Sequence, residues 1–175
     1  MISFNDFCAK NNIKLETTSN FDLINYAKQL KIKNFRGYFM RDTLPKKIKS
    51  KECGIVNLQN SNQPGTHHTA YWKNNKEKYF FDSYGLEPTN QMLKYLKPSN
   101  KSYPLIISTY QIQNSGTVIC GQLSIYMLYM LDHNHKFIDI LLSLMNEFHP
   151  DKIGGNLNED LHLVEDISTL AELLL

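Results

Sequence analysis

Eleven consecutive residues, from Gly121 to Leu131, read GQLSIYMLYML and offer almost no polar face. An amphipathic surface helix keeps one polar side, and a helix that crosses a bilayer needs about 20 apolar residues. The segment meets neither condition, so it predicts a helix buried on nearly every side within a protein core. Cys120 directly precedes the run and is therefore expected at the N-terminus of this helix.

Length and composition fit one domain built around that helix. The chain has 175 residues, 42% of them hydrophobic, which suffices for one core and is too little for two. We expect a single domain over residues 1–175. A net charge of +2 and a sequence pI near 8.3 exclude a global field that would make nucleic acid the principal partner, while leaving room for a local basic patch.

The cysteine pattern and the N-terminal sequence predict an intracellular, soluble protein. The first residues, MISFNDFCAKNNIK, lack the continuous apolar stretch of a signal peptide, and no later segment reaches membrane-spanning length. Cys8, Cys53 and Cys120 are odd in number, far apart and not at metal-ligand spacing, as is typical of a reducing compartment. At least one of them is free to react, and burial is the default expectation for Cys53.

Periodicity predicts a mixed order of helices and strands rather than a regular alternation. Helices are expected at 21–30, 89–96, about 137–148 and after 158, with a loop over 150–156. Extended segments are expected at 35–41, where the element leads into a loop, and at 54–58, 67–72, 78–82 and 104–110; the turn 73–77 joins two of them as a hairpin.

Cys120 is the candidate nucleophile. A thiol attacks carbonyls as thiolate, and its pKa falls at a helix N-terminus beside an imidazolium. Gly121 removes a side chain where a substrate backbone must approach. Taken alone, a single cysteine is more often one more small core residue.

His67 and Asp82 are the candidate base and its orienting carboxylate. His67 begins one hairpin strand after a loop, and Asp82 ends the partner strand, so strand pairing would let the carboxylate reach the imidazole. An exposed histidine and a turn-initiating aspartate are the ordinary alternatives.

Gln113 is the candidate oxyanion donor, together with the backbone N–H of Cys120. Gln111 is a rival, because alternation along an extended segment puts both glutamines on one face. A polar loop glutamine is the ordinary alternative.

The segments 65–72 (GTHHTAYW), 81–85 (FDSYG), Gln113 and 115–121 together resemble the adenovirus-protease family, and the same order of His, acid, Gln and Cys occurs in the related SUMO-specific proteases. The stretch 34–58, with Phe35-Arg36-Gly37 and Cys53-Gly54-Ile55-Val56-Asn57, looks most like the maturation proteases of virophages and of Maverick or Polinton elements. The resemblance covers about residues 21–131.

The resemblance implies an α+β, papain-like fold of the adenain type, with a mixed, mostly antiparallel sheet packed on a buried central helix. It implies a cysteine endopeptidase that needs no cofactor, cleaves viral capsid or other virion precursors near small residues such as paired glycines, and works in the host cytoplasm and the virion. The implied roles are base for His67, orienting acid for Asp82, oxyanion donor for Gln113 and nucleophile for Cys120.

The chain departs from the family pattern at His68. Relatives usually place an aromatic residue directly after the catalytic histidine, so His68 competes with His67 for the role of base. Strand alternation is expected to turn His68 to the opposite face, which favours His67.

Two further hypotheses concern processing and DNA. The segment Ile153-Gly154-Gly155-Asn156 is either a self-processing site or a helix-breaking turn. Some viral relatives are stimulated by DNA, and six basic residues are expected to form either a phosphate-binding strip or a solvated loop: Arg36, Arg41, Lys46, Lys47, Lys49 and Lys51.

Three other functions stay open at the level of sequence. An isopeptidase for ubiquitin-like modifiers would use the same residues for the same acyl transfer. An acyltransferase would need an acyl-carrier site, for which the sequence shows no motif. A capsid-associated or DNA-associated binding module would need no chemistry, but all four candidate residues are intact.

Overall fold

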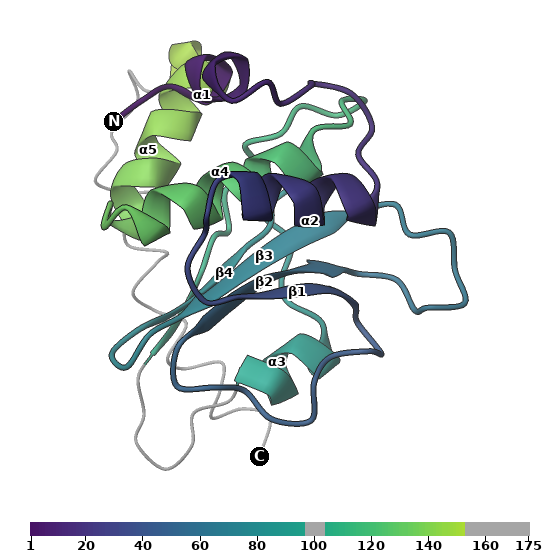
Figure 1. Ribbon diagram of the computed structural model, residues 1–175. Helices are drawn as coiled ribbons and strands as arrows, with labels where there is room; N and C mark the ends of the chain where they lie inside the picture. The colour runs from purple at the N-terminus through teal and green to yellow at the C-terminus, as the bar shows by residue number, and fades with distance from the viewer. Residues whose placement is uncertain (97–103, 153–175) are drawn as a thin grey trace.

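The computed structural model describes residues 1–96 and 104–152 of the chain. At its centre lies a five-stranded sheet whose strands follow the chain order (Figure 1). The central pairings are antiparallel and the pairings at both edges are parallel, so the mixed sheet is confirmed. The strands are β1 (Phe35–Met40), β2 (Glu52–Asn57), β3 (His68–Lys73), β4 (Lys78–Phe81) and β5 (Leu105–Ile107).

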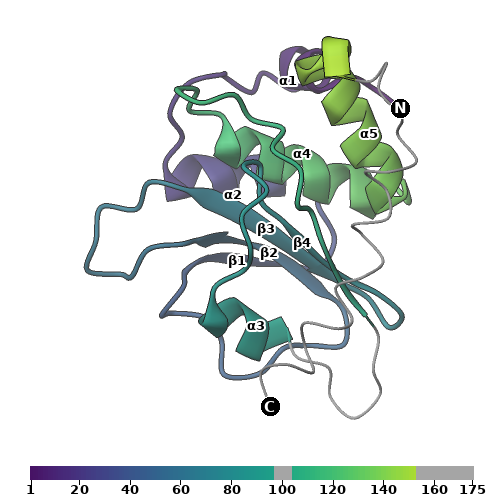
Figure 2. The same ribbon diagram turned by 180° about the vertical axis from the view of Figure 1, so that it is seen from behind.

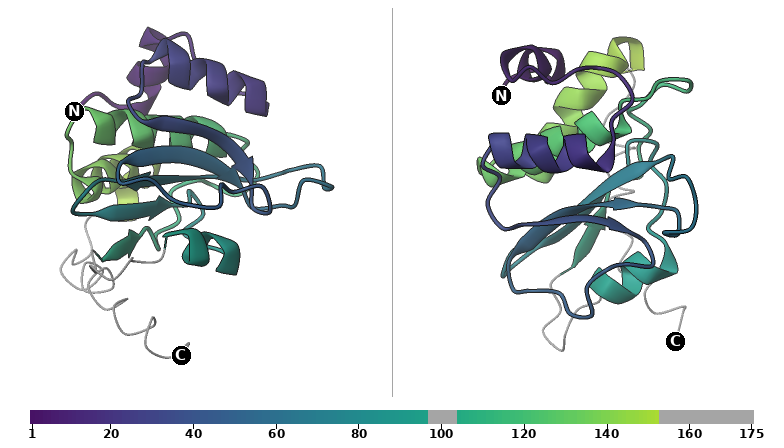
Figure 3. Two further views of the ribbon diagram at one scale, coloured as in Figure 1. Left: turned by 60° about the horizontal axis from the view of Figure 1, so that its bottom comes forward. Right: turned by 45° about the vertical axis from the view of Figure 1, so that its right-hand side comes forward.

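Helices cover both faces of the sheet, which gives three layers (Figures 1 and 2). One face carries α3 (Asn90–Leu96), and the other carries α1 (Phe4–Lys10), α2 (Asn20–Gln29), α4 (Cys120–Asp132) and α5 (Phe137–Phe148). The rotated views of Figure 3 show the same separation of layers. A short 3-10 turn, Pro150–Lys152, follows α5.

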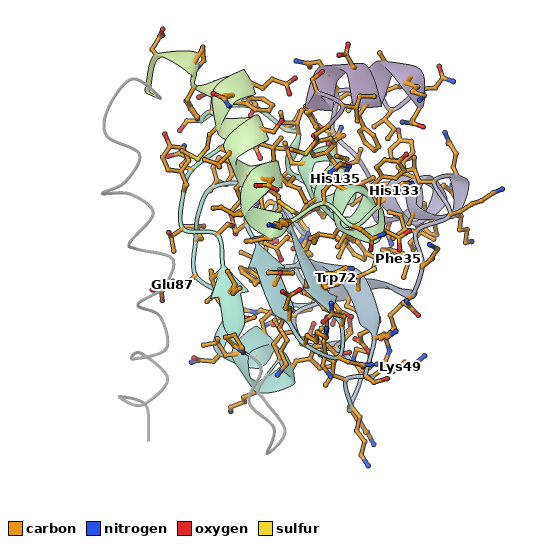
Figure 4. The ribbon with its side chains drawn as sticks, turned by 90° about the vertical axis from the view of Figure 1, so that its left-hand side faces the viewer. Phe35, Lys49, Trp72, Glu87, His133 and His135 are labelled. Atoms are coloured by element: carbon orange, nitrogen blue, oxygen red, sulfur yellow. The ribbon has the colours of Figure 1, made fainter. Side chains whose placement is uncertain are left out.

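Helix α4 is the centre of the larger core, as its apolar sequence predicts. It contacts β3 and β2 of the sheet and also the three helices α1, α2 and α5. All of its residues except Tyr129 and Asp132 are buried. Side chains fill the space between this helix and the sheet (Figure 4). A smaller apolar cluster lies between the sheet and α3 and includes Val56, Phe80 and Met92.

Most of the predicted elements are confirmed, and their ends have local causes. Helix α2 begins after Ser19, whose side chain and that of Asp22 form a capping box. Strand β5 stops at Ile107, because the Ser108 hydroxyl bonds with the backbone of Asp82 (3.1 and 3.2 Å) and draws the chain toward the end of β4. The expected strand over 104–110 was therefore too long.

One helix was not expected, and two of the expectations cannot be compared with the structure. Helix α1 has only 7 residues, too few to show helical periodicity in sequence, yet it buries Phe4, Phe7 and Cys8. The helix after residue 158 and the pair Gly154-Gly155 lie outside the described residues. Within the described part, no helix combines the length and the apolar character that crossing a bilayer requires.

Candidate active site

Cys120 is the first residue of α4, as its position before the apolar run predicts. Only 6% of its surface is exposed. The N-cap residue Ile119 supplies no side-chain hydrogen bond, and the first intrahelical bond runs from the Leu123 N–H to the Ile119 carbonyl. The amides of residues 120–122 therefore have no acceptor among the residues that the structure describes, and they lie at the positive end of the helix, beside the thiol.

His67 and Asp82 meet at the open end of the β3–β4 hairpin. His67 directly precedes β3, and Asp82 directly follows β4. Nε2 of His67 lies 3.0 Å from each carboxylate oxygen of Asp82. The backbone N–H of Tyr84 donates to Oδ1 of Asp82 (2.7 Å), and the Tyr84 ring lies 4.9 Å from the His67 ring. The Asp82 side chain is fully buried, so its orientation is fixed.

Two imidazoles approach the Cys120 thiol. Nδ1 of His68 lies 3.5 Å from Sγ, and the His67 ring is near enough to the thiol to lower its pKa. With Nε2 of His67 engaged by Asp82, its buried Nδ1 has no hydrogen-bond partner among the described residues. A carboxylate on Nε2 keeps the proton there in the neutral ring, and this leaves Nδ1 free to accept the thiol proton.

The electrostatics of the site favour a thiolate and an imidazolium. Burial raises the pKa of Cys120, but the neighbouring His67 ring and the side chain and backbone of His68 stabilise the thiolate more strongly and lower that pKa to about 6. Burial lowers the pKa of His67, whereas the hydrogen bond and charge of Asp82 and the neighbouring Cys120 thiolate raise it to about 9. Between these values the ion pair is the stable form.

The other two cysteines lack these features. Burial raises the pKa of Cys8 and of Cys53 to about 12. Cys53 is fully buried, as expected, and its thiol lies 3.5 Å from the Lys33 carbonyl oxygen. Cys120 is thus the cysteine suited to nucleophilic chemistry.

The expectation that His68 points away from the thiol was wrong. Alternation applies within a strand, but β3 begins at His68, and His67 belongs to the preceding loop, whose backbone is not pleated. Both rings can therefore turn toward Cys120. The sequence did contain a signal for this arrangement. His67 and His68 lie on the two sides of a loop–strand boundary, and the loop, rather than strand alternation, sets the direction of the His67 side chain.

Gln113 is fully buried, and its side chain is tied into the loop before α4. Its Oε1 accepts from the Ser83 hydroxyl (2.7 Å), and its Nε2 donates to the Thr117 carbonyl (2.8 Å). Gln111 is exposed, and its Nε2 donates to the Gln113 carbonyl (3.0 Å). The shared face expected for the two glutamines was wrong, since β5 ends at Ile107. The oxyanion role of Gln113 stays a prediction.

Gly121 serves packing rather than the approach of a substrate. It is buried, and a Cβ atom there would lie 2.5 Å from Oγ1 of Thr18 and 2.9 Å from Cδ2 of Leu23. The glycine thus lets α4 lie against α2 and the segment before it. The earlier interpretation of Gly121 was wrong, because its missing side chain faces the protein interior.

The six basic residues differ in their surroundings. The Arg36 guanidinium forms an ion pair with the buried carboxylate of Glu52 and donates to the Lys47 carbonyl (2.7 Å), so its charge is already compensated. Nε of Arg41 donates to Asn60 (2.7 Å). Lys46, Lys47, Lys49 and Lys51 are exposed, and their binding of DNA stays a prediction.

Two further histidines lie far from Cys120, and the described residues form no cluster that could bind a metal ion. Figure 4 shows His133 and His135 together between α4 and α5. They follow the C-terminal end of α4, a helix about 20 Å long, whereas Cys120 lies at its N-terminal end. Across the described residues, no group of three or more His, Cys, Asp and Glu side chains could hold a metal ion.

Comparison with solved structures shows a shared fold. No family model and no curated protein matches the chain. Two crystal structures of the ASFV pS273R protease, one with selenomethionine, match with TM-scores of 0.55 and 0.53, each at 12% identity over 73% of this chain. The chain spans only 61% and 62% of those protease chains. The α+β, papain-like fold of the adenain type is thereby confirmed.

Proposed function

We propose that the chain is a cysteine endopeptidase that cleaves virion precursor proteins. The observation that carries this proposal is the juxtaposition of a thiol, an imidazole and a buried carboxylate, with Cys120 heading α4 and Nε2 of His67 3.0 Å from Asp82. The shared fold with a viral protease supports the reaction class. The virion substrate rests on the family resemblance of the segments around these residues.

In the proposed reaction the Cys120 thiolate attacks the scissile carbonyl carbon, and the C–O π electrons move to oxygen. His67, protonated on Nδ1, then gives that proton to the departing amine, which leaves a thioester on Cys120. The neutral ring next takes a proton from a water molecule, whose oxygen attacks the thioester carbonyl. Collapse of this second tetrahedral intermediate breaks the C–S bond, releases the carboxylic acid and regenerates the Cys120 thiolate beside protonated His67. Asp82 keeps the ring oriented through both halves and stabilises its charged form.

The oxyanion is stabilised at the head of α4. The free backbone amide of Cys120 is one donor, since it precedes the first intrahelical bond. Gln113 is the proposed second donor: Ser83 holds its amide oxygen and Thr117 accepts one N–H, which leaves its second N–H. The chemistry uses only groups of the chain itself.

Co-expression with the major capsid protein of the same virus tests the proposal. Wild type is expected to give a defined cleavage product that Cys120→Ala and His67→Ala do not give. Cys8→Ala is the matched control, because Cys8 is equally buried but its thiol has a pKa of about 12. Equal processing by wild type and Cys120→Ala would exclude the endopeptidase. Release of a ubiquitin-like modifier instead of capsid cleavage would identify the isopeptidase.

A further inference from the structure

The side chain of His68 has no part in the proton transfers assigned to His67, yet its ring lies within hydrogen-bonding range of the nucleophile. Its Nδ1 lies 3.5 Å from Sγ of Cys120, within the range of a hydrogen bond to sulfur. The ring is almost enclosed, with 8% of the residue exposed. Within the described part of the chain, no carboxylate binds this ring, in contrast to His67.

Three elements hold the His68 ring in this position. Its backbone belongs to β3, where it pairs with Asn57 of β2. The Ser124 hydroxyl, one turn beyond Cys120 on α4, lies 3.4 Å from the His68 carbonyl oxygen and joins the strand to the helix. The Tyr38 ring of β1 lies 5.6 Å from the imidazole, at an interplanar angle of 60°. The contact with sulfur is therefore built into the core of the fold.

We propose that His68 is a positioning residue for the nucleophile: its Nδ1–H donates a hydrogen bond that stabilises the Cys120 thiolate independently of the charge on His67. This inference deepens the proposed function at the same site. It also gives a physical reason for a histidine where the resembled family usually has an aromatic residue.

The separation of tasks follows from the environment of each ring. His67 must gain and lose a proton in each turnover, and Asp82 supports its charged form. His68 lacks such a carboxylate, and a proton on its Nδ1 lets it donate to the sulfur without taking the thiol proton. The titratable side chains of the site are Cys120 from α4, Tyr38 from β1, and His67, Asp82 and Tyr84 from the segments next to β3 and β4.

The test is the pH dependence of Cys120 alkylation by iodoacetamide, followed by peptide mass spectrometry on the full chain. His68→Leu removes the donor at nearly equal volume, and the smaller His68→Asn replaces Nδ1 with an amide N–H on the same Cγ atom. Below pH 6 we expect His68→Leu to react about tenfold more slowly than wild type, since each pKa unit changes the thiolate fraction tenfold. His68→Asn should lie close to wild type.

The high-pH limit separates this effect from damage to the site. At high pH the Cys120 thiol is fully ionised in every variant, so the rates no longer depend on its pKa. His68→Leu should then react at least as fast as wild type, because a less stabilised thiolate is the better nucleophile. His68→Phe, which keeps a ring against Tyr38, repeats the test if the leucine variant does not fold. In the His67→Ala background, adding His68→Leu should slow low-pH alkylation further.

Two results would overturn the inference. One is a low-pH rate in His68→Leu and His68→Phe equal to that of wild type, and the other is an equal loss in the leucine and asparagine variants. Neither result depends on a protein substrate. A His68 effect without capsid cleavage would leave the inference in place and remove the endopeptidase, and cleavage without a His68 effect would do the reverse.

Discussion

Nε2 of His67 lies 3.0 Å from both carboxylate oxygens of Asp82, across the open end of a hairpin whose strands they flank. The register that pairs Ala70 with Phe81 places the two side chains at the same end of the paired strands. This end of the strands lies against the N-terminus of α4, where the Cys120 thiol is located. A local hairpin and one long-range helix contact thus bring together residues separated by more than fifty positions.

Replacing Asp82 with Asn should lower activity by about 100-fold and shift its pH dependence. The amide can still accept from the Tyr84 N–H, but it removes the charge that raises the pKa of His67 to about 9. The imidazolium is then lost at lower pH, so the alkaline limb of the pH–rate profile should move down. Asp139→Asn, on the exposed surface of α5, is the control. An unchanged alkaline limb would remove Asp82 from the site.

Replacing Gln113 with Ala should slow peptide cleavage by about 100- to 1,000-fold and leave Cys120 alkylation unchanged. An oxyanion develops only in acyl transfer, so the alkylation rate reports that the thiol and its surroundings are intact. Gln111→Ala should cleave at the wild-type rate, because that side chain is exposed. A loss confined to Gln111→Ala would reverse the assignment.

Replacing Gly121 with Ala should destabilise the fold by about 1–3 kcal/mol, measured by urea unfolding. The added Cβ would meet Thr18 at 2.5 Å, so Thr18→Ala in the same chain should restore part of the loss. A Gly121→Ala protein with wild-type stability and impaired cleavage would instead place this glycine against the substrate.

Replacing Glu52 with Gln should cost about 3–5 kcal/mol of unfolding free energy, because Arg36 loses its buried counter-charge. Burial raises the pKa of Glu52, but hydrogen bonds from Tyr95, the Lys49 amide, Tyr71 and Arg36 lower it overall. The stabilisation is therefore present above the ordinary glutamate range and lost as pH falls through the lowered pKa. The exposed Glu77→Gln is the control, with a change within about 0.5 kcal/mol.

The strongly periodic or uniformly apolar segments could be predicted from the sequence. The buried helix beginning at Cys120 and the amphipathic helix α5 follow directly from residue pattern, as does the hairpin that ends near Asp82. Helix α1 could not be predicted, because it is short and its stability comes from burying Phe4 and Phe7 against α4.

The side-chain geometry around Cys120 was hard to predict from the sequence. Neither His68 nor Gly121 was placed correctly, because each depends on a tertiary contact: His68 with the thiol, and Gly121 with Thr18. Alternation along the chain gives no direction outside a strand, and a glycine in sequence does not show which neighbour its missing side chain admits.

The most direct test of the central claim is the ultraviolet titration of the Cys120 thiolate, taken as the absorbance difference between wild type and Cys120→Ser across pH. The contacts of the thiol with His67 and His68 predict that thiolate absorbance appears with a midpoint of about pH 6, well below the 9.0 of an unperturbed cysteine. A difference signal that appears only near pH 9 or above would mean that the thiol is not activated, and would contradict the proposed active site.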